Sequence, residues 1–244
     1  MPKTNKSAKM KNGRTPFAVV EAYNTIRTNL LFVLSQRKGR SFAVSSANPG
    51  EGKSTTALNI ASSFSQLGSK ILIIDADMRK PILHKKAHIE NGKGLSSVLV
   101  GFCGIDEAIH EINPYLYLLP SGPTPPNPGE LLASEAFDEL MASLKEKFDY
   151  VIIDTPPINV VSDALVTATR TDGMVLVARD RKTYHDEFKS AVSSVEFANV
   201  KILGAVLNAV DVQDGEKYKY KYKYRYRYRY RSYSNSAYIN NNNQ

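Results

Sequence analysis

Six short apolar runs, interspersed with segments of helical spacing, constrain the fold of this chain more than any other sequence feature. The runs occupy residues 41–46, 70–75, 115–120, 150–154, 173–179 and 201–209. Several are apolar throughout, which is typical of strands buried on both faces. Helical patterns occupy residues 16–36, 53–67, 134–147, 162–169 and 184–198. Repeated alternation of strand and helix predicts an α/β fold with a doubly wound, mostly parallel sheet flanked by helices.

The two ends of the chain and one internal stretch break this pattern. Residues 1–15 read as a disordered basic arm, and residues 212–244 as a flexible tail rich in tyrosine. Between them, residues 16–211 are predicted to form one globular domain. Within that domain "PSGPTPPNPGE", at residues 120–130, holds too many prolines for a helix or a central strand. We therefore expect a stiff loop there.

The net charge of +8 is carried by the ends of the chain rather than by the predicted domain. Residues 217–231 alternate eight cations with seven tyrosines, and residues 1–14 hold five cations and no acid. Residues 15–216 therefore carry a net charge of −5, because the last thirteen residues are uncharged. A mildly acidic globule is not the pattern of a basic DNA-binding fold, although the basic ends could contact anionic lipid or nucleic acid.

Cysteine content and hydropathy indicate the compartment. The single cysteine, Cys103, excludes an internal disulfide and fits a reducing cytoplasm. We find no apolar stretch after the N-terminal cations, as a signal peptide would need, and no run of about 18 apolar residues that could span a bilayer. The sequence predicts a cytoplasmic protein that reaches a membrane only through a partner or its basic ends.

The strongest chemical signal is a glycine-rich turn between a predicted strand and a predicted helix. It lies within "VSSANPGEGKSTTALNIA" at residues 44–61. Glycine N–H groups can cradle phosphate oxygens there, and the following helix directs its positive end toward the same point. Ala47 stands where a P-loop usually has its first glycine. The candidate nucleotide-binding residues of this turn are Pro49, Gly50, Glu51, Gly52, Lys53, Ser54 and Thr55.

Three aspartates follow two of the predicted strands. Asp75 and Asp77 end one apolar run, and Asp154 ends another. The carboxyl ends of parallel strands are where open α/β sheets bind ligands, and a carboxylate near a P-loop can hold Mg²⁺ directly or through water. For each aspartate alone, a structural role in capping the following loop stays open.

Together these motifs resemble those of the bacterial tyrosine kinases (BY-kinases) of capsule and exopolysaccharide synthesis, in their cytoplasmic single-domain form. The resemblance rests on "SANPGEGKST", "ILIIDADMRKP" and "VIIDTPP", on the proline-rich loop and on the terminal tyrosine cluster. It implies a P-loop kinase that uses ATP and Mg²⁺. By the same resemblance, Lys53 binds phosphate, Ser54, Asp75 and Asp154 hold Mg²⁺, and Asp77 accepts the tyrosine proton. Asn208 ends the last predicted strand, where related ATPases often contact adenine, although a plain turn residue is an equal reading.

The resemblance also implies partners and acceptors. Kinases of this family assemble into rings through a helix motif, of which this chain keeps Glu21 and Arg27 but has Asn24 in place of the middle arginine. They phosphorylate protein tyrosines, including their own. A transmembrane protein activates them, and a phosphatase removes the phosphate groups that they transfer. The candidate acceptors are Tyr218, Tyr220, Tyr222, Tyr224, Tyr226, Tyr228, Tyr230, Tyr233 and Tyr238.

Other functions share some of these features. A positioning ATPase related to ParA and MinD would have the same fold and carboxylates, but it usually carries a second lysine where this chain has Asn48. A nucleotide-binding scaffold that displays a tyrosine docking tail is a third possibility. The repeat of cations and tyrosines could also bind single-stranded nucleic acid or pair as an edge strand. Beside a kinase-like domain we expect self-phosphorylation and no specific nucleic acid.

Overall fold

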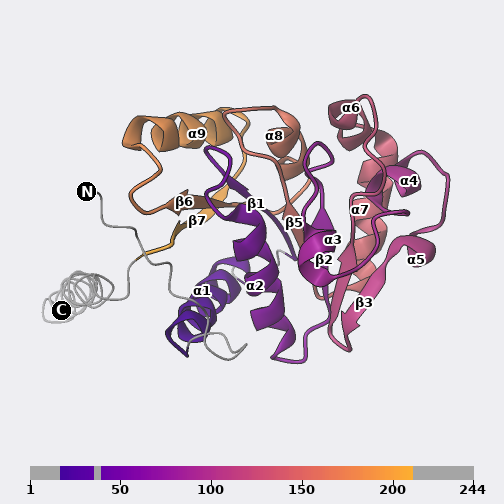
Figure 1. Cartoon of the computed structure of the whole chain (residues 1–244), viewed down its shortest axis with the longest axis horizontal. Coiled ribbons are helices and arrows are strands. Elements are labelled where there is room, and N and C mark those ends of the chain that lie inside the picture. Colours follow the sequence, from indigo (N-terminus) through magenta and orange to yellow (C-terminus); the bar gives the residue numbers. More distant parts are fainter. Residues whose placement is uncertain (1–16, 36–39, 211–244) are drawn as a thin grey trace, which may run out of the picture. The chain divides into compact units, whose positions relative to one another are not determined.

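A seven-stranded sheet forms the centre of the computed structural model, which describes residues 17–35 and 40–210 (Figure 1). The strands are β1 (Ser41–Ser46), β2 (Ile71–Asp75), β3 (His110–Asn113), β4 (Leu116–Leu119), β5 (Tyr150–Asp154), β6 (Met174–Arg179) and β7 (Ile202–Asn208). Their order is β3-β4-β2-β5-β1-β6-β7. All neighbours are parallel except β3 and β4, which pair antiparallel. The predicted doubly wound, mostly parallel sheet is confirmed.

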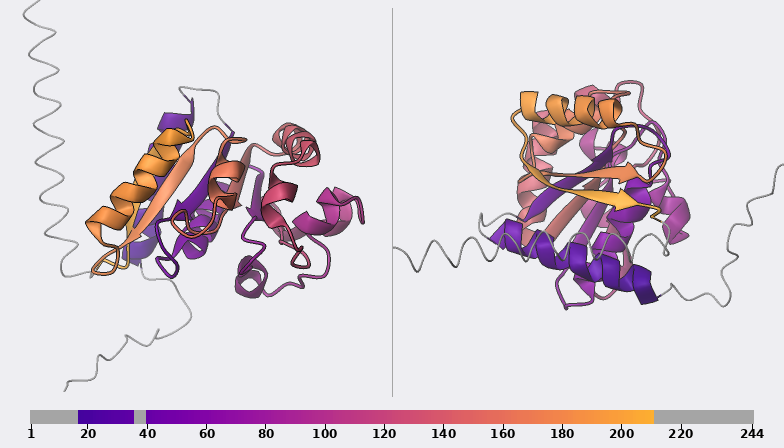
Figure 2. Two further views of the ribbon diagram at one scale, coloured as in Figure 1. Left: turned by 90° about the horizontal axis from the view of Figure 1, so that it is seen from above. Right: turned by 90° about the vertical axis from the view of Figure 1, so that its left-hand side faces the viewer.

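Helices cover both faces of the sheet, as Figure 2 shows with α1 and α9 on opposite sides. The long helices are α1 (Phe17–Ser35), α2 (Lys53–Ser65), α7 (Glu135–Lys147) and α9 (His185–Phe197). The short ones are α3 (Leu83–Ala87), α4 (Leu95–Leu99), α5 (Ile105–Ala108), α6 (Pro128–Leu132) and α8 (Asp163–Ala168). Alternate side chains of the central strands serve the two faces: Ile71 and Ile73 pack with α1 and α2, whereas Leu72 and Ile74 pack with α7. This double burial explains why the strand sequences are apolar throughout.

One prediction about local structure needs correction, and several elements were not predicted at all. The proline-rich stretch 120–130 is not all loop, because α6 begins at Pro128. Proline is tolerated at the first helical position, where its missing N–H would have no helical partner anyway. The edge strand β3 was not predicted, since its sequence is polar and its side chains are largely exposed. The three short helices α3, α4 and α5 also carry too few turns for a readable period.

One compact unit of the fold ends at Asn208. The proposed domain boundaries at residues 15 and 211 fall at or outside the edges of the described residues, and they stay predictions. Across residues 17–35 and 40–210, no helix combines the length and apolar character needed to cross a bilayer. Because β1, β2 and β5 are parallel neighbours, their carboxyl ends meet at one edge of the sheet. That edge carries the P-loop and the three aspartates.

Candidate active site

The loop from Ala47 to Gly52 joins β1 to α2 in the conformation that a phosphate-binding turn requires. Gly50 and Gly52 both have left-handed backbones, with φ of 76° and 100°. A Cβ atom at Gly52 would also collide with the side-chain amide of Asn208. Ala47 is fully buried in the core, so the position of the missing first glycine is filled by a methyl group without exposing it.

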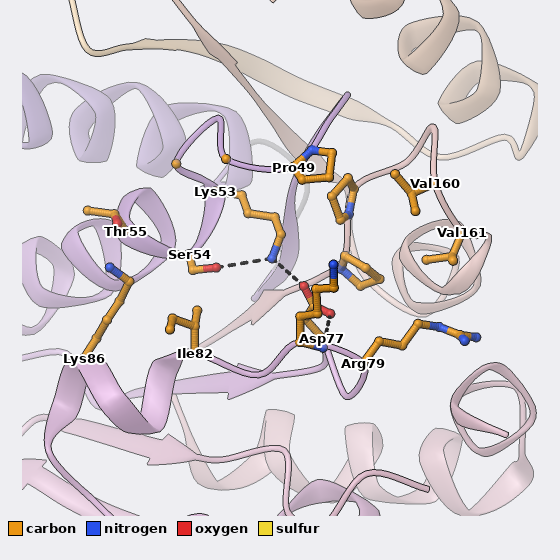
Figure 3. Close-up of a pocket in the computed structure, with 15 residues that line it drawn as sticks. Pro49, Lys53, Ser54, Thr55, Asp77, Arg79, Ile82, Lys86, Val160 and Val161 are labelled. Carbon is orange, nitrogen blue, oxygen red and sulfur yellow. Dashed lines mark hydrogen bonds and ion pairs between the residues drawn. The ribbon is translucent and has the colours of Figure 1, made fainter. Parts of the chain in front are cut away.

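A pocket of about 360 Å³ opens beside this loop (Figure 3). Its walls combine the P-loop with the segments that follow β2 and β5. The charged side chains on these walls are Lys53, Asp77, Arg79, Lys80 and Lys86. Val160 and Val161 add an apolar surface at one side, which Figure 3 shows near Arg79. Basic groups and an apolar wall around a P-loop can accept an anionic phosphate chain together with a ring.

Lys53 is the centre of the charge network in this pocket. Its ammonium lies 2.9 Å from Asp77 Oδ2 and 3.5 Å from Asp154 Oδ1, and it donates a hydrogen bond of 3.2 Å to Ser54 Oγ. Burial alone would lower the pKa of Lys53, but the carboxylates of Asp154 and Asp77 raise it above its usual value. Lys53 is therefore a cation at neutral pH and can bind phosphate oxygens.

Asp154 offers the best fit to a metal ion. The residue is fully buried, and neither carboxylate oxygen accepts a well-formed hydrogen bond from the described residues. Burial raises the pKa of Asp154 to about 6, and the adjacent Lys53 ammonium opposes this rise. A buried carboxylate whose oxygens accept no well-formed hydrogen bond from the described part of the chain, next to the Ser54 hydroxyl, supplies hard oxygen ligands of the kind that Mg²⁺ prefers. No cluster of three or more His, Cys, Asp or Glu side chains suited to a metal occurs within the described ranges.

Asp75 is placed differently, because backbone donors already occupy both of its oxygens. Oδ2 accepts N–H bonds from Ile82 at 3.0 Å and Leu83 at 2.9 Å, and Oδ1 accepts one from Asp77 at 3.2 Å. Burial and the charge of Asp154 raise the pKa of Asp75 to about 7. These bonds fold the segment after β2 back toward the pocket, so Asp75 has the loop-capping role that was left open from the sequence. A role at the metal stays a prediction.

Asp77 and Arg79 project from that folded segment. Asp77 Oδ1 accepts the Lys80 N–H at 3.1 Å, while Oδ2 faces Lys53. Arg79 makes two hydrogen bonds to the buried carboxylate of Asp163, from Nε at 2.8 Å and from Nη2 at 3.2 Å. Asp163 therefore fixes a guanidinium on the wall of the pocket. It was not predicted from the sequence, since the contact joins residues 84 positions apart.

The remaining predicted residues are divided between the pocket and other places. Thr55 and Pro49 line the pocket, whereas the side chain of Glu51 does not. Asn208 donates an Nδ2–H bond of 2.9 Å to the Glu51 carbonyl and does not line the pocket. It therefore contacts the P-loop from outside the pocket. On α1, Glu21 accepts a hydrogen bond from Asn24, and Arg27 donates one of 2.5 Å to the Ser63 carbonyl in α2. The candidate acceptor tyrosines lie outside the described residues.

Comparison with known proteins places this site in a family. Residues 39–187 match the family described as AAA domain. The tyrosine-protein kinase YwqD of Bacillus subtilis (strain 168) is 43% identical over 199 residues, which cover 81% of this chain and 84% of the relative. The tyrosine-protein kinase CpsD of Streptococcus agalactiae is 39% identical over 193 residues, covering 78% and 83%. The solved kinase domain of Escherichia coli tyrosine kinase ETK aligns with a TM-score of 0.77 at 30% identity, covering 83% and 85%.

Proposed function

The chain belongs to the bacterial tyrosine kinase family, and from this premise we propose that it phosphorylates the tyrosines of its own C-terminal repeat with ATP, between subunits. The observation that carries the proposal is the convergence of Lys53, Ser54 and Asp77 on one pocket beside the P-loop, with the buried Asp154 carboxylate 3.5 Å from the Lys53 ammonium. Family membership also favours a kinase over the positioning ATPase and the scaffold considered from the sequence.

The chemistry follows from the residues present. In the transfer, the phenolic oxygen of tyrosine forms a bond to the γ-phosphorus of ATP while the bond to the bridging oxygen of ADP breaks. The phenolic proton passes to a base, for which Asp77 is the candidate because its carboxylate lines the pocket. Phosphoryl transfer proceeds mostly through a loose transition state, so positioning and charge neutralisation supply most of the catalysis. Lys53 provides a positive charge for the phosphate oxygens.

Mg²⁺ would be held by the Ser54 hydroxyl and the Asp154 carboxylate. When bound, the ion neutralises charge on the phosphate chain. The buried, hydrogen-bond-poor oxygens of Asp154 support this assignment. Asp75 is the weaker candidate for direct ligation, since backbone N–H groups occupy its oxygens. We assign Asp75 mainly to holding Asp77 in place.

The composition of the tail suits an acceptor. Nine tyrosines lie between residues 218 and 238, so many alternative registers present a phenol to the same site. A segment of about 25 residues can reach at most roughly 80 Å when extended. We propose that this reach lets the tail of one subunit enter the pocket of another.

Phosphorylation of the tail would also reverse its charge. Each phosphate adds about −1.5 to −2, so modifying all nine tyrosines changes the charge of residues 217–244 from +8 to roughly −6 to −10. The remaining body is acidic, with a net charge of −5 over residues 15–216. We propose that the unmodified tail promotes subunit association and that the modified tail is repelled. A tail-deleted protein that assembles and dissociates as the full chain does would refute this switch.

The proposed setting comes from the family. The kinase would form a homo-oligomeric ring and work with a transmembrane activator that recruits it to the inner face of the membrane. A cognate tyrosine phosphatase would remove the phosphate groups. Its output would regulate capsule or exopolysaccharide synthesis and export. The absence of a bilayer-spanning helix from residues 17–35 and 40–210 is compatible with recruitment through a partner.

A mixing experiment tests the transfer between subunits. One protein carries Lys53→Met and an intact tail; the other keeps the pocket but has the nine tail tyrosines changed to phenylalanine. With ATP, Mg²⁺ and the cytoplasmic segment of an activator, we expect phosphotyrosine on the Lys53→Met protein only in the mixture. If phosphotyrosine forms in the wild-type chain but never in the mixture, transfer occurs within one subunit.

A further inference from the structure

The P-loop is held from outside the pocket by the β6–α9 loop, residues 180–184, and by the end of β6 that precedes it. We propose that Glu51 and Thr183 are positioning residues that fix the P-loop in its phosphate-binding shape before nucleotide arrives. Neither side chain lines the pocket. The inference rests on the proposed function only in taking the P-loop as the nucleotide site.

Glu51 has an unusual place for an acidic residue in a phosphate-binding loop. Pro49, Gly50 and Gly52 line the pocket, whereas Glu51 turns away from it and is 1% exposed. Its Oε2 accepts the Asn48 N–H at 3.1 Å, and its Oε1 accepts the Thr183 hydroxyl at 2.6 Å. One carboxylate thus spans the P-loop and ties it to the β6–α9 loop.

We call the contacts that Glu51, Thr183, Arg179 and Lys182 make around the P-loop the bracket. The Thr183 hydroxyl is both a hydrogen-bond donor and an acceptor in this bracket. It donates to Glu51 and accepts the backbone N–H of Arg179 at 2.8 Å. A hydroxyl is the group that can do both at one atom, so serine can replace threonine here and valine cannot. The P-loop is thereby fixed to the carboxyl end of β6, an inner strand of the sheet.

Two cations complete the bracket by binding P-loop carbonyl groups. Arg179 Nη1 donates to the Gly50 carbonyl at 3.0 Å, and Lys182 Nζ lies 3.3 Å from the carbonyl oxygens of both Pro49 and Gly50. With these oxygens engaged by exposed cations, the adjacent N–H groups are the ones available to an anion. The two positive charges also offset the Glu51 carboxylate, which alone would oppose phosphate binding.

The bracket acts through the P-loop and touches no reacting atom, so its effect belongs on nucleotide affinity rather than on turnover. We expect Thr183→Val to weaken binding of ADP with Mg²⁺ about tenfold, the order of one lost hydrogen bond to a charged group. Thr183→Ser should stay within about twofold of wild type because it keeps the hydroxyl. In the kinase assay, Thr183→Val should raise the KM for ATP by the same factor and leave kcat within about threefold.

The measurement is calorimetric titration of the full-length protein with ADP and Mg²⁺, beside the melting temperature without nucleotide. A lowered melting temperature with unchanged ADP affinity would show a merely structural contact and overturn the proposal, as would equal weakening by Thr183→Ser. If Thr183→Val does not fold, Glu51→Leu decides: its side chain can accept neither the Asn48 N–H nor the Thr183 hydroxyl, so unchanged ADP affinity again overturns the proposal. Because ADP binding needs no tyrosine acceptor, this test fails independently of the proposed kinase activity.

Discussion

Lys53 Nζ lies 2.9 Å from Asp77 Oδ2 within the candidate active site, and this ion pair joins the candidate phosphate-binding lysine to the candidate base. Asp154 is the third member, 3.5 Å from the same ammonium. Without nucleotide, the lysine therefore balances the two carboxylates that Mg²⁺ and the tyrosine proton would otherwise meet. Phosphate groups would draw Lys53 away and release Asp77.

This arrangement predicts that Lys53 lowers the affinity of the nucleotide-free protein for a divalent cation. Removing the ammonium in Lys53→Met leaves carboxylates that repel one another and attract a metal. We expect the nucleotide-free variant to bind Mn²⁺, an electron-paramagnetic probe for Mg²⁺, about tenfold more tightly than wild type, which is a gain of about 1.4 kcal/mol. Titration followed by paramagnetic resonance measures the affinity. The double variant Lys53→Met/Asp154→Asn should lose the gain, and equal Mn²⁺ affinity of wild type and Lys53→Met would contradict the balance.

The ionised carboxylate of Asp154 should lower the free energy of unfolding at neutral pH. Burial raises its pKa to about 6, above the value near 4 in an unfolded chain. The folded state therefore binds more protons in this window, and the free energy of unfolding falls as the pH rises from about 4 to 6. Asp154→Asn removes this contribution while Lys53 keeps its contact with Asp77.

We expect Asp154→Asn to be more stable than wild type at pH 7.5 without Mg²⁺, by about 2 kcal/mol, and to lose kinase activity. Urea unfolding at pH 5 and pH 7.5 measures the difference, which should shrink at the lower pH. A variant less stable than wild type at pH 7.5 would show that Asp154 stabilises the fold instead.

Much of the fold was readable from the sequence because the central strands are buried on both faces. Residues 71–74 are all fully buried, and their unbroken apolar run marks β2 directly. The edge strand β3 carries no such mark, since it is antiparallel and largely exposed. The start of α6 at Pro128 was not predicted, because it lies in a proline-rich stretch whose composition favours a loop. A proline is compatible with a helix when it occupies the first helical position, as Pro128 does.

The candidate site was predictable only where a residue's neighbours in sequence define its role. Lys53 and Ser54 follow the glycine turn, and Asp154 ends its strand, so local pattern located all three. Thr183 and Asp163 were missed because they meet Glu51 and Arg79 across distances of 132 and 84 residues. A single chain shows no periodicity or spacing that reports such contacts.

The ion pair of Arg79 with Asp163 should show asymmetric energetics. The Asp163 side chain is only 3% exposed whereas that of Arg79 is 45% exposed, so removing the arginine leaves a buried, uncompensated carboxylate. We expect Arg79→Ala to lower the free energy of unfolding by about 2 kcal/mol and Asp163→Asn by about 1 kcal/mol. The double variant should recover part of the loss of Arg79→Ala. Urea unfolding of the three variants tests this, and strictly additive losses would contradict the coupling.

The contacts of helix α1 predict weak association of subunits through this helix. Asn24 bonds to Glu21 and Arg27 bonds to the Ser63 carbonyl, so these motif residues are engaged within the chain. We expect Asn24→Arg, which restores the middle arginine of the family motif, to shift the protein toward larger oligomers at equal concentration. Sedimentation velocity measures this, with Asn24→Gln as the uncharged control. An unchanged distribution for Asn24→Arg would show that this helix does not form the contact.

Phosphate mapping on the full-length protein tests the central claim most directly. The protein is incubated with ATP, Mg²⁺ and the cytoplasmic segment of its activator, and modified residues are located by mass spectrometry beside a Lys53→Met control. We predict phosphate on tyrosines between residues 218 and 238, and none in the control. Phosphate confined to serine and threonine, or ATP hydrolysis that leaves every tail tyrosine unmodified, would contradict it.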